Sequence, residues 1–272
     1  MRQDSRSRGV RLSVETLEGR ALLSVAPGLK LTASPPMLAV AGGIKTDPAG
    51  VAAVLKALSG GAGSEFVTLI RREVPNLQAV IAGFVSGRIT SFTAPGIAAK
   101  IPKFQSAYTG GPTYDNLSAT LAGAVVLPGN VLELAAVMRG PFDEASPCQV
   151  VFGLDRGAGA KRGPIFAARP KITPDALVTI NVGPYGRNPT ATVTDLTTGK
   201  TTAIDPSKVQ VTGPVARVYV DLSALPSEGQ PVAKYRFATW TRAQPGGGIA
   251  NVGSFVPEST MVQVGVLNPP KR

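Results

Sequence analysis

The chain of 272 residues contains no histidine and a single cysteine, and only 6% of its residues are aromatic. Without histidine, neither a Ser-His-Asp nor a Cys-His arrangement can form, and most zinc sites lose their usual ligands. Cys148 stands alone, so no intramolecular disulfide can form. We therefore expect Cys148 to be a small buried apolar residue and the fold to rest on its hydrophobic core.

Long apolar runs are also missing, and no stretch approaches the roughly 18 apolar residues that a membrane-spanning helix needs. The net charge is nevertheless high, at +11, and the basic residues are spread thinly along the chain. Nucleic-acid-binding proteins usually concentrate such charge on one face and place aromatic residues within it. We therefore expect no nucleic-acid partner and a diffuse basic surface that tolerates anionic envelope polymers.

The N-terminal segment has the outline of an export signal. Several arginines precede a short apolar patch at residues 21–26, and Glu15 and Glu18 stand just ahead of that patch. A secretory signal has a basic beginning followed by a longer apolar middle. Composition alone therefore leaves two interpretations open, a weak signal peptide and a disordered basic tail.

Residues 17–23 carry the pattern LEGRALL. This pattern resembles the N-terminal leader of large families of planctomycete surface and secreted proteins, whose shared core reads Leu-Glu-Pro-Arg-x-Leu-Leu. The chain has Gly19 where those families have proline, which leaves the backbone free at that point. The resemblance implies export or sorting to the cell envelope, and it implies nothing about the domain that follows. The matching positions are Leu17, Glu18, Arg20, Leu22 and Leu23.

We expect three parts along the chain, of which residues 1–45 are an export or sorting leader with a flexible linker, dispensable for folding. Residues 46–84 read as a short helical segment that packs on a sheet. Asp47 and the proline after it suit a helix start, a second helix begins near Ser64, and residues 77–85 fit either a helix or a buried strand. The second helix presents one apolar face, formed by Phe66, Leu69 and Ile70.

The third part, residues 85–268, contains short β-branched runs separated by Pro, Gly, Asn and Asp. This spacing is typical of an antiparallel β-sandwich of the jelly-roll or immunoglobulin-like kind, and not of alternating strands and helices. The clearest hairpin spans residues 191–204, where Gly199 supplies the positive φ of a tight return. We expect strands at 89–93, 98–108, 118–126, 131–138, 149–154, 165–168, 176–182, 190–194, 201–204, 208–211, 217–222, 235–241 and 261–266.

The most glycine-rich loop spans residues 153–163. A phosphate-binding loop stands between a strand and a helix, whereas residues 165–168 read as a strand, so we expect no nucleotide site. We interpret the segment as a long mobile hairpin loop and as the best place on the chain for a polar ligand. Its charged residues are Asp155, Arg156, Lys161 and Arg162.

A second candidate site lies in the run at residues 235–242. Strand alternation places Trp240 on one face between Arg236 and Arg242. An exposed tryptophan between two arginines would suit stacking against an acidic glycan. We favour the alternative that Trp240 belongs to the core or is covered by the arginine stems.

Acidic residues could still supply the pair of carboxylates that a glycoside hydrolase needs. Nearly all of them flank Pro, Gly or Ser, as acids in turns do, and no calcium-binding ladder appears. We therefore predict no catalytic residue, no metal site and no cofactor. The acids considered are Asp143, Glu144, Asp155, Asp175, Asp195, Asp205, Asp221 and Glu228.

Together these features predict an exported, non-enzymatic structural or interaction component of the cell envelope or extracellular space. Its expected partner is an anionic envelope polysaccharide or another surface protein. Two alternatives stay open. A carbohydrate-binding module for anionic polysaccharide needs an exposed aromatic row or a concave sheet face, and a histidine-free glycoside hydrolase needs two acids that face each other.

Overall fold

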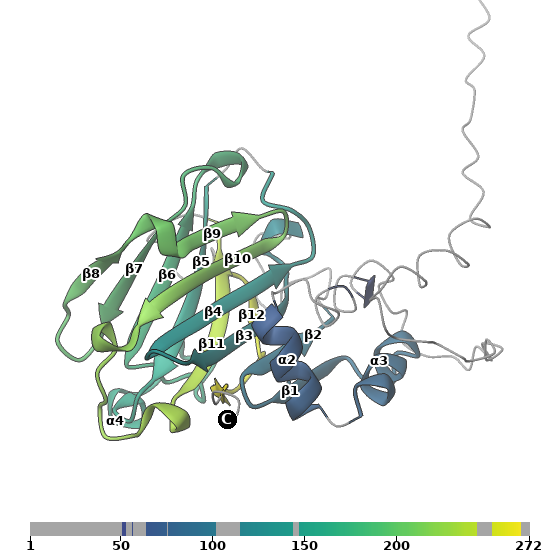
Figure 1. Ribbon diagram of the computed structural model, residues 1–272, viewed down its shortest axis with the longest axis horizontal. Coiled ribbons are helices and arrows are strands. Elements are labelled where there is room, and N and C mark those ends of the chain that lie inside the picture. The colour runs from purple at the N-terminus through teal and green to yellow at the C-terminus, as the bar shows by residue number, and fades with distance from the viewer. Residues whose placement is uncertain are drawn as a thin grey trace, which may run out of the picture. The chain divides into compact units, whose positions relative to one another are not determined.

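The structure is a computed structural model that describes residues 51–52, 56, 64–74, 76–101, 115–143, 147–243 and 252–267. In this part the chain is mainly β, and two sheets pack face to face (Figure 1). The predicted β-sandwich is confirmed. The predicted leader at 1–45 and the helix start at Asp47 lie outside the described residues.

The first sheet has the strand order β1-β2-β3-β4-β10-β9, and its neighbouring strands are antiparallel. A short strand near the C-terminus, β14, pairs in parallel with the end of β3. The strands are β1 (Ser91–Ala94), β2 (Ile97–Lys100), β3 (Ala119–Leu127), β4 (Val131–Met138), β9 (Val209–Thr212), β10 (Val215–Asp221) and β14 (Gly265–Val266).

The second sheet has the order β12-β11-β5-β6-β7-β8, again antiparallel, and β13 pairs with the start of β11. The chain crosses between the sheets after β4, after β8, after β10 and after β13. The strands are β5 (Cys148–Asp155), β6 (Ala176–Val182), β7 (Thr190–Asp195), β8 (Thr201–Ile204), β11 (Arg236–Arg242), β12 (Val252–Val256) and β13 (Val262–Gln263).

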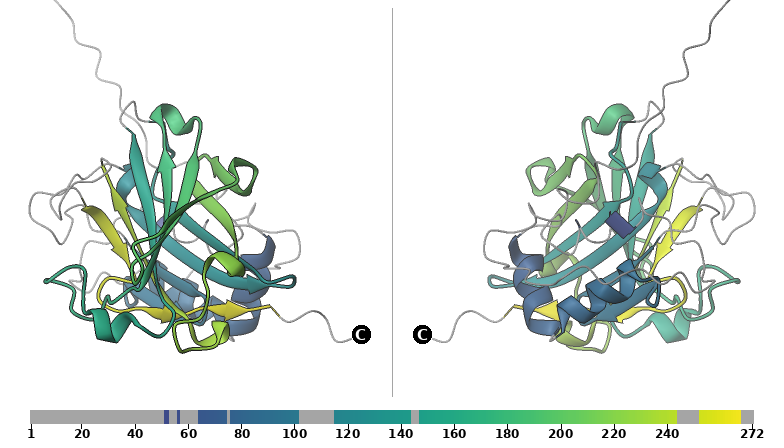
Figure 2. Two further views of the ribbon diagram at one scale, coloured as in Figure 1. Left: turned by 90° about the vertical axis from the view of Figure 1, so that its left-hand side faces the viewer. Right: turned by 90° about the vertical axis from the view of Figure 1, so that its right-hand side faces the viewer.

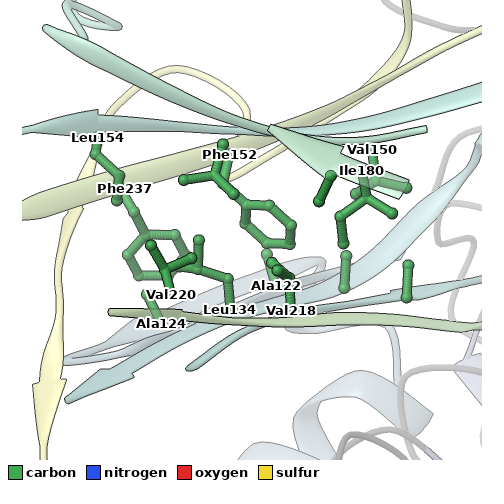
Figure 3. Close-up of a cluster of buried hydrophobic side chains, with 14 of the residues drawn as sticks. Ala122, Ala124, Leu134, Val150, Phe152, Leu154, Ile180, Val218, Val220 and Phe237 are labelled. Carbon is green, nitrogen blue, oxygen red and sulfur yellow. The ribbon is translucent and has the colours of Figure 1, made fainter. Parts of the chain in front are cut away.

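The main core lies between the two sheets, where alternate residues of each strand point inward. Figure 3 shows Phe152 and Ile180 of the second sheet facing Val218 and Ala122 of the first. Cys148 is buried in this core, and burial raises the pKa of its thiol to about 12. The thiol therefore stays protonated, and the prediction of a small buried apolar residue is confirmed.

Two helices lie on the outer side of the first sheet (Figure 2). Helix α2 (Ser64–Glu73) begins where predicted, and its apolar face is buried against β3 and β4. Residues 77–85, which the sequence left open, form helix α3 (Leu77–Val85). The Asn76 side chain settles this choice locally, because it accepts a hydrogen bond from the Ala79 amide and caps the helix.

The contact between α2 and the sheet depends on Gly123, a glycine on the outer face of β3. The Phe66 ring lies over it so closely that a Cβ at position 123 would come within 2.0 Å of a ring carbon. Phe66 is itself buried. A strand glycine often marks such a close approach, and here it makes room for the helix.

Gly123→Ala is therefore expected to lower the free energy of unfolding by about 1–3 kcal/mol, since overpacking displaces a buried ring. Urea denaturation followed by circular dichroism measures the change. The double variant Gly123→Ala/Phe66→Leu should recover part of the loss. If the single variant is as stable as the parent, α2 does not depend on this contact.

The hairpin predicted at 191–204 is confirmed, with Ala191 paired to Ile204 and Gly199 at φ 75°. The strand predicted at 165–168 is wrong. Helix α4 (Gly159–Arg162) and turns occupy this connection, because the Asp155 carboxylate accepts the amides of Gly157 and Gly159 and starts a helical turn. Within the described residues, β12 is a strand that the sequence did not predict.

Short 3-10 helices complete the described elements, and no described helix is both long and apolar enough to cross a membrane. Asp205 and Asp221 each accept the backbone amide two residues further on, at 2.9 Å, and so cap two of these helices. The 3-10 helices are η3 (Asp115–Leu117), η4 (Pro184–Gly186), η5 (Pro206–Lys208), η6 (Leu222–Ala224) and η7 (Val232–Lys234).

Candidate functional site

Three acidic residues, Asp175, Asp195 and Glu228, surround the side chain of Arg156 just after the end of β5. This side chain is fully buried. Its Nε donates to Asp175 Oδ1 at 2.8 Å, and its Nη2 donates to Asp195 Oδ2 at 3.1 Å. Its Nη1 donates to the carbonyl oxygen of Pro226 at 3.1 Å, and Glu228 Oε1 lies 3.7 Å from Nη2.

These contacts tie three chain connections together. Asp175 precedes β6, Asp195 begins the β7–β8 turn, and Pro226 and Glu228 belong to the segment between β10 and β11. The amide of Glu228 also donates back to the Arg156 carbonyl oxygen at 3.2 Å. A guanidinium has five N–H donors in a fixed fork, which allows one side chain to hold all three connections.

Electrostatics reinforce this cluster. Burial opposes the charge on Arg156, but its hydrogen bonds and ion pairs with Asp175 and Asp195 outweigh this and raise its pKa above the ordinary value. Burial likewise acts to raise the pKa of Asp195, but hydrogen bonds from Thr197, Thr198 and Arg156 lower it to about 2. Asp195 is therefore an anion at every physiological pH.

Asp155 points to the other side of the same strand end and is almost fully buried. One of its oxygens pairs with the guanidinium of Arg236 on β11, and the other accepts the amides of Gly157 and Gly159. Asp155 and Arg156, both predicted to bind a polar ligand, thus hold internal partners. Burial leaves neither side chain available to a ligand.

The remaining candidates of the β5–β6 loop face solvent. Lys161 and Arg162 in α4 are exposed, and Arg162 donates to the carbonyl oxygen of Leu196 in the β7–β8 turn. Arg236 is also exposed, with 44% of its side chain accessible. The predicted ligand-binding residues of this region thus form two groups. Asp155 and Arg156 are buried and bind other parts of the chain, whereas Lys161, Arg162 and Arg236 are exposed.

Trp240 is fully buried, which confirms the favoured prediction that it belongs to the core, and the alternative of an exposed stacking platform is wrong. Its ring meets Phe166 edge-on at 5.3 Å between centroids, and Phe255 of β12 lies 5.8 Å away. The alternation predicted for 235–242 holds, because Phe237 faces the main core and Trp240 faces the opposite side. Both sides are covered, and Arg242 is partly buried beside Trp240.

The acids weighed for glycoside hydrolysis do not face each other across an open space. Between Asp175 and Asp195 lies the guanidinium of Arg156, in the place where a sugar and a water would have to be. Glu144 lies outside the described residues. In the described part, no three His, Cys, Asp or Glu side chains are grouped so that they could hold a metal ion.

A buried carboxylate that the sequence reading passed over lies on the outer face of the first sheet. Glu133 on β4 is fully buried, and its Oε1 lies 3.1 Å from Nε of Arg217 on β10. Burial raises the pKa of Glu133 to about 7, with help from the charge of Glu65, although Arg217 and the Tyr219 hydroxyl act to lower it. The sequence carries one sign of this buried carboxylate, since Glu133 is the single acidic residue among the apolar residues of β4.

Comparison with known proteins adds no candidate function. No protein-family model matches the chain, and no curated protein sequence matches it.

Proposed function

We propose that this chain is exported and serves as a non-enzymatic structural or interaction component of the cell envelope or extracellular space. The observation that carries this proposal is the use of the polar residues at the end of β5. Asp155, Arg156, Asp175 and Asp195 hold chain connections in place, as the residues of a scaffold do, and are not arranged around a substrate.

Without an intramolecular disulfide, an exported chain needs another way to hold its loops, and we assign this role to the Arg156 cluster. An exported chain with one cysteine cannot staple its loops covalently. The buried guanidinium of Arg156 instead bonds acceptors from three connections and fixes their arrangement, since removal of one partner would leave an uncompensated buried charge. The chain thus holds three of its surface connections together without a disulfide.

The first test is location. We expect the C-terminally tagged full chain, expressed in a planctomycete, to appear in the envelope fraction or the medium. A variant with Leu22 and Leu23 both changed to aspartate should stay in the cytoplasm, because it removes the apolar part of the leader. Recovery of the parent chain in the cytoplasm would contradict the proposal.

The second test is catalysis. Screens for esterase, protease, phosphatase and glycosidase activity are expected to show no turnover by the purified chain. Turnover that Asp155→Asn or Glu133→Gln abolishes, in a variant that circular dichroism shows to be folded, would establish an enzyme. Turnover that survives in both variants and co-elutes with the folded chain would equally contradict the proposal.

A further inference from the structure

In the loop between β6 and β7, Tyr185 has a backbone conformation that tyrosine rarely adopts. Tyr185 has φ 56° and ψ 29°, the left-handed region that glycine adopts readily and tyrosine rarely does. Gly186 and Asn188, at φ 71° and 48°, share this region but are residue types that fit it. The sequence therefore keeps a tyrosine where glycine would cause less strain.

The Tyr185 ring also gains little from burial, because 58% of the residue is exposed, the largest exposed fraction of any large apolar side chain described. Aromatic side chains of soluble proteins usually bury most of their surface. Backbone strain together with an exposed ring points to a role in contact with something outside the chain.

Two polar groups accompany the ring. The guanidinium carbon of Arg187 lies 6.0 Å from the ring centroid, and Arg187 and Asn188 are both exposed. Among the described residues, Arg187 has no carboxylate within ion-pair distance. The loop thus presents an aromatic face, a cation and an amide within four residues, at the opposite end of β6 and β7 from α4.

We propose that residues 184–188, the Tyr185 loop, bind an acidic sugar residue of an anionic polysaccharide. The sugar ring stacks on Tyr185, its carboxylate pairs with Arg187, and Asn188 accepts or donates a hydroxyl hydrogen bond. This contact rests on the proposed non-enzymatic role outside the cell. A stable protein partner usually needs about 800 Å² on each side, whereas one ring and two polar side chains match a saccharide in size.

Because the backbone at Tyr185 is strained, replacing Tyr185 by glycine separates a binding role from a structural one. Tyr185→Gly removes the ring and relieves the backbone, so the melting temperature should stay the same or rise while binding falls by about 5-fold or more. A purely structural tyrosine would give the opposite result, a lower melting temperature. Arg187→Ala should weaken binding at low salt and matter less at high salt, since screening shortens the reach of its charge.

Affinity electrophoresis in gels containing polygalacturonate measures the binding of the full chain. Lys171→Ala is the control with the same charge change, at an exposed lysine between α4 and β6 that belongs to none of the candidate sites. We expect retardation of the parent and of Lys171→Ala, and weaker retardation of both loop variants. The proposal is overturned by no retardation, by equal effects of Arg187→Ala and Lys171→Ala, or by tighter binding to a single-stranded oligonucleotide or to anionic vesicles. Failure here leaves the location test untouched, so the two proposals fail separately.

Discussion

Arg156→Met is expected to lower the free energy of unfolding by about 3–5 kcal/mol, because it leaves buried acids without their cation. Asp175 is fully buried and accepts from both the side chain and the backbone of Arg156. Methionine fills much of the same volume, so the loss reports the charge and not a cavity. Loops from three parts of the chain lose their common anchor at the same time.

Urea denaturation of the parent and the variant measures this loss. Arg72→Met is the matched control, since Arg72 pairs with Glu73 at 2.6 Å on the surface and such pairs contribute about 1 kcal/mol or less. The double variant Arg156→Met/Asp175→Asn should recover part of the stability by removing the stranded charge. A loss no larger than that of the control would mean that the cluster does not hold the loops.

Turn residues made much of the sandwich predictable. The strands predicted at 131–138, 176–182 and 201–204 have those bounds in the structure, because Gly, Pro, Asn or Asp residues stand close to both ends of each run. The unpredicted strand β12 contains a glycine and a serine and pairs with β11. Such pairing has no local signature in the sequence.

The candidate site was less predictable because burial there is decided by distant parts of the chain. Arg156 is enclosed by residues that lie 19, 39 and 70 positions further along. Trp240 is covered by Phe166, in a segment that the sequence predicts to be a strand. A periodic pattern shows which side of a strand a residue occupies, but it does not show what covers that side.

Glu133 supplies the last prediction, a pH dependence of stability between about pH 4.5 and 7. In the folded chain the pKa of Glu133, about 7, lies above the ordinary value of 4.5 for a glutamate, so the folded state holds the proton more tightly than the unfolded chain. Protonation of Glu133 therefore favours the folded state, and this contribution to the free energy of unfolding is fully present below pH 4.5 and is lost as the pH rises through 7. The difference between the two pKa values corresponds to about 3 kcal/mol of that free energy.

Glu133→Gln isolates this contribution, because glutamine keeps the shape and does not titrate. We expect the variant to gain stability relative to the parent by about 3 kcal/mol as the pH is raised from 4.5 to 7.5, whatever its absolute stability. Unfolding in urea at several pH values measures the difference. A constant difference between Glu133→Gln and the parent over this range would mean that Glu133 is already ionised in the folded protein. In that case the ion pair with Arg217 outweighs the cost of burial, and the outer face of the first sheet carries a permanent charge beneath α2.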